Sequence, residues 1–145
     1  MPDLRMVTAL PQSLRPAYEA LLASAGLRDE EDADCTALLS SDGGALLACG
    51  SVSGRVLKQI AVAPWAEGDG ACARIVTALL EESARRGVAH PFLYTKPKNA
   101  RLFRSLGFFP VAETADMLMM EHRRGGVERY IASLPAYDGE SGAVV

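Results

Sequence analysis

The chain has 145 residues, of which 49% are hydrophobic and 23% charged, and its formal net charge is −3. This length is that of one domain, and the acidic balance argues against a nucleic-acid-binding protein, which needs a basic face. No apolar run approaches the ~20 residues of a membrane span. The three cysteines, Cys35, Cys49 and Cys72, have no paired spacing, and the N-terminus lacks the apolar region of a signal peptide. These features predict a cytoplasmic protein without a disulfide framework or a membrane partner.

Two elements and an acidic segment begin the chain. Residues 4–9 predict a strand, and residues 11–25 predict a helix because apolar side chains recur there at helical spacing. Gly26 follows the helix, as glycine commonly does. Five acids then stand close together, namely Asp29, Glu30, Glu31, Asp32 and Asp34. A solvated loop is favoured over a metal cluster, because adjacent acids do not converge on one point.

Three strands are predicted next, at residues 35–41, 45–51 and 56–63. Asp42-Gly43-Gly44 separates the first two, and Asp-Gly between apolar runs is a strong hairpin signal. Gly50 and Gly54 bracket a second predicted turn at residues 51–53. An antiparallel meander therefore leads into the glycine-bearing loop at residues 64–69.

The segment from residue 56 to residue 87 predicts a strand, a loop with Gly68, and a helix that begins near Gly70. Glycine allows unusual backbone angles and close approach of a ligand, and a helix N-terminus offers unpaired N–H groups with a partial positive charge. Together they predict a phosphate-binding site. No Gly-Lys-Ser/Thr follows, which excludes a Walker loop. Ala73 stands where a dinucleotide fingerprint has its third glycine, and that fingerprint also needs a parallel strand–helix–strand unit.

The helix itself is predicted to be amphipathic. Its buried face is expected to comprise Cys72, Ile75, Val76, Leu79 and Leu80. The remaining predicted elements are a strand at 91–95, a short helix at 100–106 between Asn99 and Gly107, two antiparallel strands at 108–112 and 117–121, and a small helix at 126–134. Residues 1–134 are predicted to form one domain. Residues 135–145 are predicted to be a linker toward a missing C-terminal domain.

This order of elements resembles the GNAT (N-acetyltransferase) fold, an α+β (mixed α/β) fold with a central, mostly antiparallel sheet flanked by helices. Residues 56–64 are similar to the fourth strand of that family. Residues 67–72 stand in place of its Arg/Gln-x-x-Gly-x-Gly/Ala loop, and residues 99–108 are similar to its Asn-plus-Leu-Gly-Phe segment.

The resemblance implies acetyl-CoA or another acyl-CoA, or a CoA-like pantetheine ligand, and no metal. The pyrophosphate would lie on main-chain N–H groups of residues 68–73, and pantetheine would extend the sheet along residues 60–62. The implied cofactor-binding residues are Ile60, Ala61, Val62, Gly68, Asp69, Gly70, Ala71, Cys72, Ala73, Asn99 and Phe103.

Two loop residues depart from the family pattern. Glu67 replaces the Arg or Gln at the start of the loop and brings a negative charge near the expected pyrophosphate. Cys72 takes the place of the last small residue. A structural role is favoured for Cys72 because cysteine is small and often buried, although a helix N-terminus lowers the pKa of a thiol.

Catalytic residues are left unassigned. Acyl transfer to an amine needs a base for the ammonium and an acid for the departing thiolate. Phe103 stands where many family members have a Tyr that acts as the general acid. Lys58 and Gln59 stand where many have a Glu that acts as the base. Tyr94 and Asn99 are weak candidates, and for Tyr94 a place in the core is favoured.

The two histidines, His90 and His122, are interpreted as surface residues rather than catalysts.

A closer resemblance is to the N-terminal GNAT-like domain of the citrate lyase ligase family. It is carried by residues 56–62, 92–99 and 102–111, with support from residues 125–134 and 142–145. That family uses ATP and acetate to acetylate the prosthetic-group thiol of citrate lyase, and the resemblance assigns this chemistry to the missing part. Two functions stay open: an acyl-CoA-binding acetyltransferase domain, and a non-catalytic recognition module for the CoA-like arm of the citrate lyase acyl-carrier subunit.

Overall fold

A computed structural model describes residues 2–68 and 70–122. The chain divides into a first unit, Met1–Tyr94, and a second unit that begins at Thr95. The predicted helix at 126–134 and the predicted linker at 135–145 lie outside the described residues. None of the described helices combines the length and the apolar character needed to cross a membrane.

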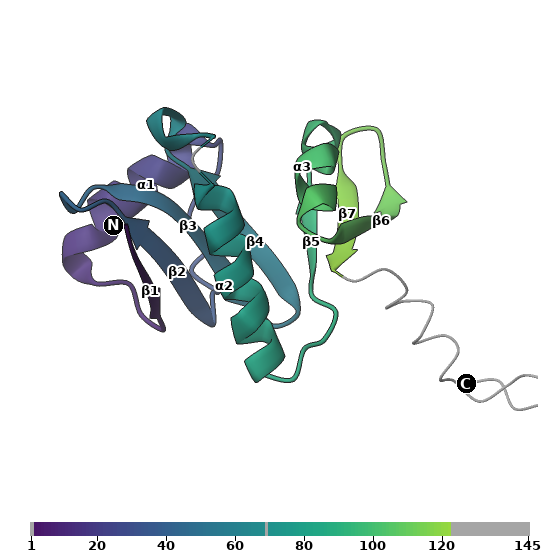
Figure 1. Cartoon of the computed structure of the whole chain (residues 1–145), viewed down its shortest axis with the longest axis horizontal. Helices are drawn as coiled ribbons and strands as arrows, with labels where there is room; N and C mark the ends of the chain where they lie inside the picture. Colours follow the sequence, from purple (N-terminus) through teal and green to yellow (C-terminus); the bar gives the residue numbers. More distant parts are fainter. Residues whose placement is uncertain (1, 69, 123–145) are drawn as a thin grey trace, which may run out of the picture. The chain divides into compact units, whose positions relative to one another are not determined.

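The first unit combines a sheet with two helices (Figure 1), as the predicted α+β class requires. Its elements are β1 (Asp3–Val7), α1 (Arg15–Ser24), β2 (Cys35–Ser40), β3 (Leu46–Ser53), β4 (Val56–Val62), α2 (Ala71–Arg85) and all but the last residue of β5 (Phe92–Thr95). The strands lie in the order β1-β2-β3-β4-β5. Pairing is antiparallel from β1 to β4, and β5 is parallel to β4. The predicted meander is therefore confirmed.

The second predicted turn is wrong, because β3 continues through it to Ser53. Val52 is fully buried and pairs with Leu57 of β4. Ser51 is also buried, and its hydroxyl lies 2.9 Å from that of Thr36 on β2. The chain reverses instead at Gly54, whose φ of 58° lies in the left-handed region that glycine tolerates.

Gly50 is a packing residue rather than a turn residue. A Cβ atom at this position would lie 2.6 Å from Ile75 Cγ2 and 2.8 Å from Leu79 Cδ1, both on α2. The missing side chain thus lets α2 lie close against the sheet. Cys72 and Leu80 of α2, predicted on its buried face, are only half-buried.

The helix α1 covers the opposite face of the sheet. Its Tyr18 donates a hydrogen bond to Gln59 Oε1 of β4 at 3.3 Å, and both side chains are buried. Successive residues of a strand face opposite sides, so Gly50 packs under α2 while Ser51 faces the side of the sheet that α1 covers. Figure 1 shows the two helices on the two sides of the strands.

The second unit contains α3 (Ala100–Ser105) and an antiparallel pair formed by β6 (Phe108–Glu113) and β7 (Leu118–His122). Phe108 is its fully buried centre. Its ring centroid lies 5.9 Å from that of Phe103 and 5.1 Å from that of His122. The predicted short helix and strand pair are confirmed.

Candidate cofactor site

A β-bulge interrupts β4 where the cofactor was predicted to bind. The strand register pairs Cys49 with Ala61 and Ser51 with Lys58, so Gln59 and Ile60 together oppose the single residue Gly50. Gln59 has a φ of 55°, which is uncommon for a residue other than glycine. In the sequence, Gln59 stands out only as an unsuitable base, because glutamine gives no signal for such a conformation.

Beyond this bulge, β4 and β5 are no longer paired. Across the described part of the two strands, pairing is confined to Val56 and Phe92, at the start of each strand. The Phe92 N–H donates to the carbonyl of Arg55 at 3.0 Å. On the other edge of β4, Ala61 and Val62 remain paired with β3. Residues 60–62 therefore have one paired edge and one edge that β5 does not occupy.

The glycine loop takes the conformation that the sequence predicted. Gly68 has a φ of 88° and Gly70 a φ of 79°, and α2 begins at Ala71, directly after Gly70. A Cβ at either glycine would meet no atom within 4 Å. Open space thus lies above both, and the first-turn N–H groups of α2 have no partner within the helix. Asp69 lies outside the described residues.

Cys72 of this first turn is half-buried, and burial raises the pKa of its thiol. Burial also raises the pKa of the Cys35 thiol, and that of Cys49 to about 12. The structural interpretation of Cys72 is therefore favoured, because the thiolate is the reactive form. Glu67 is exposed, which leaves its side chain in solvent.

The remaining predicted cofactor residues, Asn99 and Phe103, belong to the second unit. The Asn99 side-chain N–H donates to Thr95 Oγ1 at 3.1 Å and makes no cap to α3. Phe103 is 6% exposed and packs against Phe108. Their role in binding stays a prediction.

Tyr94 is 57% exposed, so its predicted place in the core is wrong. It lies on the face of β5 opposite Leu93 and Thr95, which are both buried. Its ring makes a T-shaped contact with Phe92, with centroids 5.8 Å apart. Because the residue is exposed, Tyr94 stays a candidate acid.

His90 and His122 are half-buried rather than fully on the surface. His122 packs its ring against Phe108 on the second unit. Neither lies on the predicted cofactor stretch of β4 or on the glycine loop.

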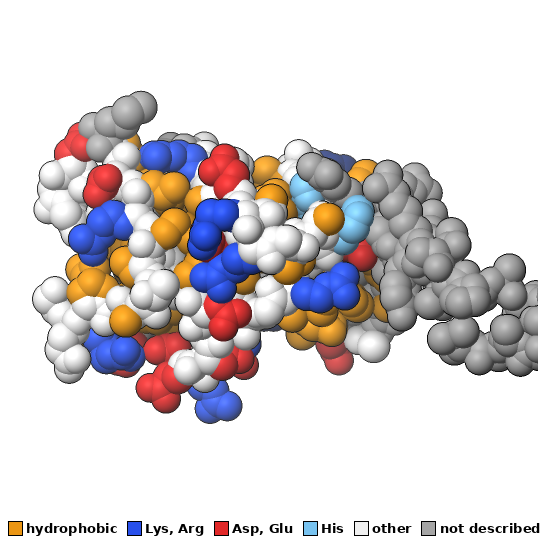
Figure 2. Space-filling model, turned by 90° about the horizontal axis from the view of Figure 1, so that it is seen from below, with side chains coloured by type: hydrophobic (Ala, Val, Ile, Leu, Met, Phe, Trp, Pro, Cys, Tyr) orange, Lys and Arg blue, Asp and Glu red, His pale blue; other side chains and the backbone are white. Residues whose placement is uncertain are grey.

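Lys58, the neighbour of Gln59, forms ion pairs with the acidic segment at residues 29–34. Its Nζ lies 3.0 Å from Glu30 and 2.8 Å from Asp32, and these partners raise the pKa of Lys58. Arg15 pairs with Asp29 at 3.2 Å in the same way. Within residues 2–68 and 70–122, no three His, Cys, Asp or Glu side chains gather as metal ligands would. On the face shown in Figure 2, acidic and basic side chains are interspersed.

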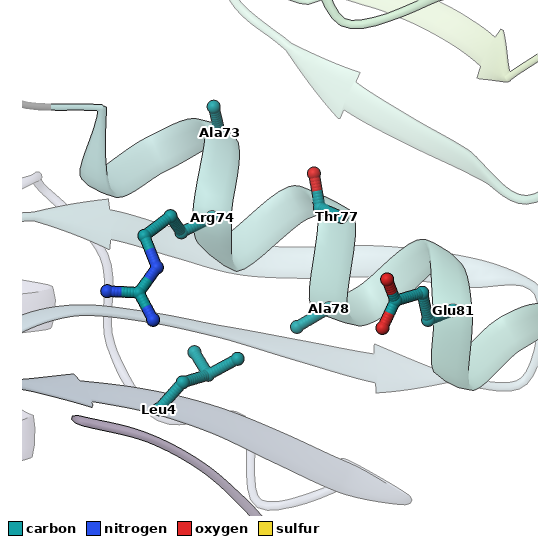
Figure 3. Close-up of a pocket in the computed structure, with 6 residues that line it drawn as sticks. All are labelled: Leu4, Ala73, Arg74, Thr77, Ala78 and Glu81. Carbon is teal, nitrogen blue, oxygen red and sulfur yellow. The ribbon is translucent and has the colours of Figure 1, made fainter. Parts of the chain in front are cut away.

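A separate hollow of about 280 Å³ lies between α2 and β1 (Figure 3). It is lined by Leu4, Ala73, Arg74, Thr77, Ala78 and Glu81. Arg74 reaches across it and donates to the carbonyl of Pro2 at 3.4 Å. Ala73 is the single predicted cofactor residue in this lining, so the hollow is not the predicted site.

No family model matches the chain. Among curated proteins, the citrate lyase ligase of Klebsiella pneumoniae is 38% identical over 108 residues, which are 73% of this chain and 32% of that protein. The citrate lyase ligase of Escherichia coli is 31% identical over 93 residues, or 63% of this chain and 26% of that protein. The chain thus spans about a third or less of the length of these relatives.

Solved structures identify the fold. An acyl-CoA N-acyltransferase from Pseudomonas aeruginosa has a TM-score of 0.72 at 15% identity, covering 84% of this chain and 99% of that one. ElaA from Escherichia coli has a TM-score of 0.69 at 16% identity, covering 85% and 100%. The N-acetylglutamate synthase of Neisseria gonorrhoeae, solved with coenzyme A, has a TM-score of 0.65 at 16% identity, covering 83% and 35%. The chain therefore has the GNAT N-acetyltransferase fold, and over 73% of its length it is similar to a citrate lyase ligase.

Proposed function

We propose that this chain is an acetyltransferase-type domain that binds acetyl-CoA or another acyl-CoA. The observation that carries the proposal is the parting of β4 from β5 directly after Val56, beside a glycine loop that leads into α2. The two features belong to the same unit and offer a strand edge and a helix N-terminus together.

The glycine loop suits the pyrophosphate. Gly68 and Gly70 hold left-handed backbone angles before the first turn of α2, where unpaired N–H groups and the helix dipole favour an anion. The exposed Glu67 opposes this attraction, which predicts a weaker site than one with Arg or Gln in its place.

The parted strands suit the pantetheine arm. Pantetheine contains two amides, and an extended ligand can add to a sheet edge by main-chain hydrogen bonds. Residues 60–62 have such an edge, because their pairing with β3 engages only one side of β4. The structure of a GNAT neighbour in complex with coenzyme A supports this ligand class.

Turnover is the second part of the proposal. Tyr94 is the candidate acid because the residue is exposed, and Asn99 is the other candidate catalytic residue. Phe103 has no hydroxyl and is buried, so it cannot act as the acid. The base stays unassigned.

The similarity to citrate lyase ligases extends the proposal to a partner. We infer that residues 1–134 form the binding domain, that residues 135–145 link it to a further domain, and that the ligand arm can come from the citrate lyase acyl-carrier subunit. Three unpaired cysteines support a cytoplasmic location.

Calorimetric titration with CoA and acetyl-CoA tests the binding. Gly70→Ala forces a side chain into a left-handed conformation, and Gly54→Ala does the same in a turn away from the loop. Each is expected to destabilise the fold by roughly 1–2 kcal/mol. Only Gly70→Ala is expected to weaken CoA binding, by about tenfold, which corresponds to about 1.4 kcal/mol.

A turnover assay with acetyl-CoA and a panel of amines separates the two functions. CoA release above background supports the transferase, whereas tight binding with background release supports the recognition module. If CoA, acetyl-CoA and the carrier protein all fail to bind, the proposed function is wrong.

A further inference from the structure

We propose that Gln59 is a positioning residue, whose side chain holds the β4 bulge and thereby orients the main chain of residues 60–62 toward the pantetheine arm. This inference rests on the proposed function and adds a residue that determines the geometry of that site. It explains why a buried glutamine occupies a conformation that glycine usually takes.

The backbone of Gln59 is the first evidence. Its φ of 55° stands at the point where two residues of β4 oppose one residue of β3. In bulges with a left-handed first residue, that residue is typically glycine. A glutamine pays a steric penalty there, so other contacts have to hold it in place.

The side-chain amide supplies these contacts. Its oxygen accepts a hydrogen bond from the Tyr18 hydroxyl of α1 at 3.3 Å, and its Nε2 donates to the carbonyl of Arg28 at 2.8 Å. Gln59 is 6% exposed, and both ends of its amide are thus satisfied in a buried place. The carbonyl of Gln59 also accepts a hydrogen bond from Cys49 Sγ at 3.5 Å. Side chain and main chain of Gln59 are therefore both tied down.

The bulge sets the orientation of the following residues. Main-chain N–H and C=O groups alternate between the two edges of a strand, so a shift of one residue exchanges the groups that face β3 with those that face away. Ala61 and Val62 keep the register that follows the bulge, paired with Cys49 and Ala48. Without the bulge, the opposite set of groups of residues 60–62 would face the open edge.

The packing of Ile60 makes the same register necessary. A Cβ at Gly50 would lie 3.3 Å from Ile60 Cγ1, alongside Ile75 and Leu79 of α2. Ile60 thus packs under α2, whereas Gln59 points toward Tyr18 of α1. The bulge lets Gln59 bind α1 while Ile60 packs under α2. One edge of β4 stays paired with β3, and the other edge is left for the ligand.

The test uses the whole chain and two probes, CoA and ADP, because ADP has the diphosphate but lacks the pantetheine arm. Gln59→Gly keeps the left-handed angle accessible and removes the anchors. Tyr18→Phe leaves Gln59 in place and removes one anchor. Lys58→Ala is the control, because Lys58 neighbours Gln59 but pairs with the acidic segment.

Affinities are measured by calorimetry for CoA and by competition for ADP. Gln59→Gly is expected to weaken CoA binding about tenfold and Tyr18→Phe about threefold, the scale of one or two hydrogen bonds, while ADP binding stays as in the unchanged chain. Hydrogen exchange at residues 60–62 is expected to become faster in both variants. Lys58→Ala is expected to change the affinity for neither CoA nor ADP.

Three results would overturn the inference. Equal loss of CoA and ADP binding would show that Gln59 supports the fold in general, and unchanged CoA binding would show that it does not position the arm. If Gln59→Gly does not fold, unchanged CoA binding in Tyr18→Phe has the same meaning. Failure of the unchanged chain to bind CoA, acetyl-CoA and the carrier protein would instead refute the proposed function itself.

Discussion

The close packing of α2 on Gly50 gives a quantitative prediction for Gly50→Ala. The new methyl group would lie 2.6 Å from Ile75 Cγ2 and 2.8 Å from Leu79 Cδ1, about 1 Å inside ordinary carbon–carbon contact. Inserting a methylene-sized group into a packed core costs about 1–3 kcal/mol, and two simultaneous overlaps place this site near the upper end. Gly50 has no positive φ, so the alanine gains back roughly 0.4–1 kcal/mol of unfolded-state entropy.

The expected net loss is therefore about 2 kcal/mol in the free energy of unfolding. For a domain of this size, that corresponds to a melting temperature lower by about 8 °C. Urea unfolding followed by circular dichroism measures the free energy. Gly43→Ala is the matched control, because its Cβ would meet only Ser41 Oγ, at an ordinary 3.9 Å.

A double-mutant cycle tests the cause. In Gly50→Ala with Ile75→Ala, the closest overlap is removed, so the combined loss is expected to be smaller than the sum of the two single losses by about 1 kcal/mol. If Gly50→Ala is as stable as Gly43→Ala, or if the two losses add without coupling, the assignment of Gly50 as a packing residue is wrong.

Charge pairing and burial at three other side chains have consequences that titration can measure. Arg85 and Arg86 lower the pKa of Glu82 to about 2, so its stabilising effect is present above its ordinary pKa of 4.5 and is lost as the pH falls toward about 2. Glu82→Gln should therefore be less stable than the unchanged chain at neutral pH and equally stable in acid. A difference in stability that does not change with pH would contradict this. Burial raises the pKa of Tyr18 from 10.0 to about 12, so stability should fall as the pH rises between these values, and Tyr18→Phe should remove this part of the alkaline decline. Burial raises the pKa of Cys72, so mass spectrometry should show its alkylation at neutral pH to be slower than that of free cysteine, and rapid labelling would restore the reactive interpretation.

The meander and the glycine loop could be predicted because their signals are local. Asp42-Gly43 marks a hairpin by its own backbone preferences, and Gly70 precedes a helix whose apolar spacing is regular over four turns. The order of these elements then identified the fold. The two solved structures from Pseudomonas aeruginosa and Escherichia coli share it at 15% and 16% identity, where little but element order and a few motif residues persists.

The functions of individual glycines could not be separated from the sequence. Gly50 and Gly54 both looked like turn residues, but only Gly54 has a positive φ. Gly50 instead allows close packing of α2, a helix that begins 21 positions later in the chain, at Ala71. Such a role depends on a tertiary contact, and no local pattern records it.

The bulge in β4 and the exposure of Tyr94 were missed for related reasons. Gln59 holds its left-handed angle through Tyr18 and Arg28, which are distant in sequence. Tyr94 lies in an apolar run that reads as a buried strand, yet one face of β5 is exposed at that position. In both cases the conformation or exposure of the residue depends on tertiary packing, which the local sequence does not record.

The parting of β4 from β5 also bears on the colloidal behaviour of the protein. An unpaired strand edge is a template on which a strand of another molecule can add. Within residues 2–68 and 70–122, β5 leaves the edge of β4 at residues 60–62 without a paired strand. A ligand that occupies this edge stabilises the folded state by mass action and at the same time blocks the template. We therefore expect a bound ligand to lower the tendency of the protein to aggregate through the main-chain groups of residues 60–62.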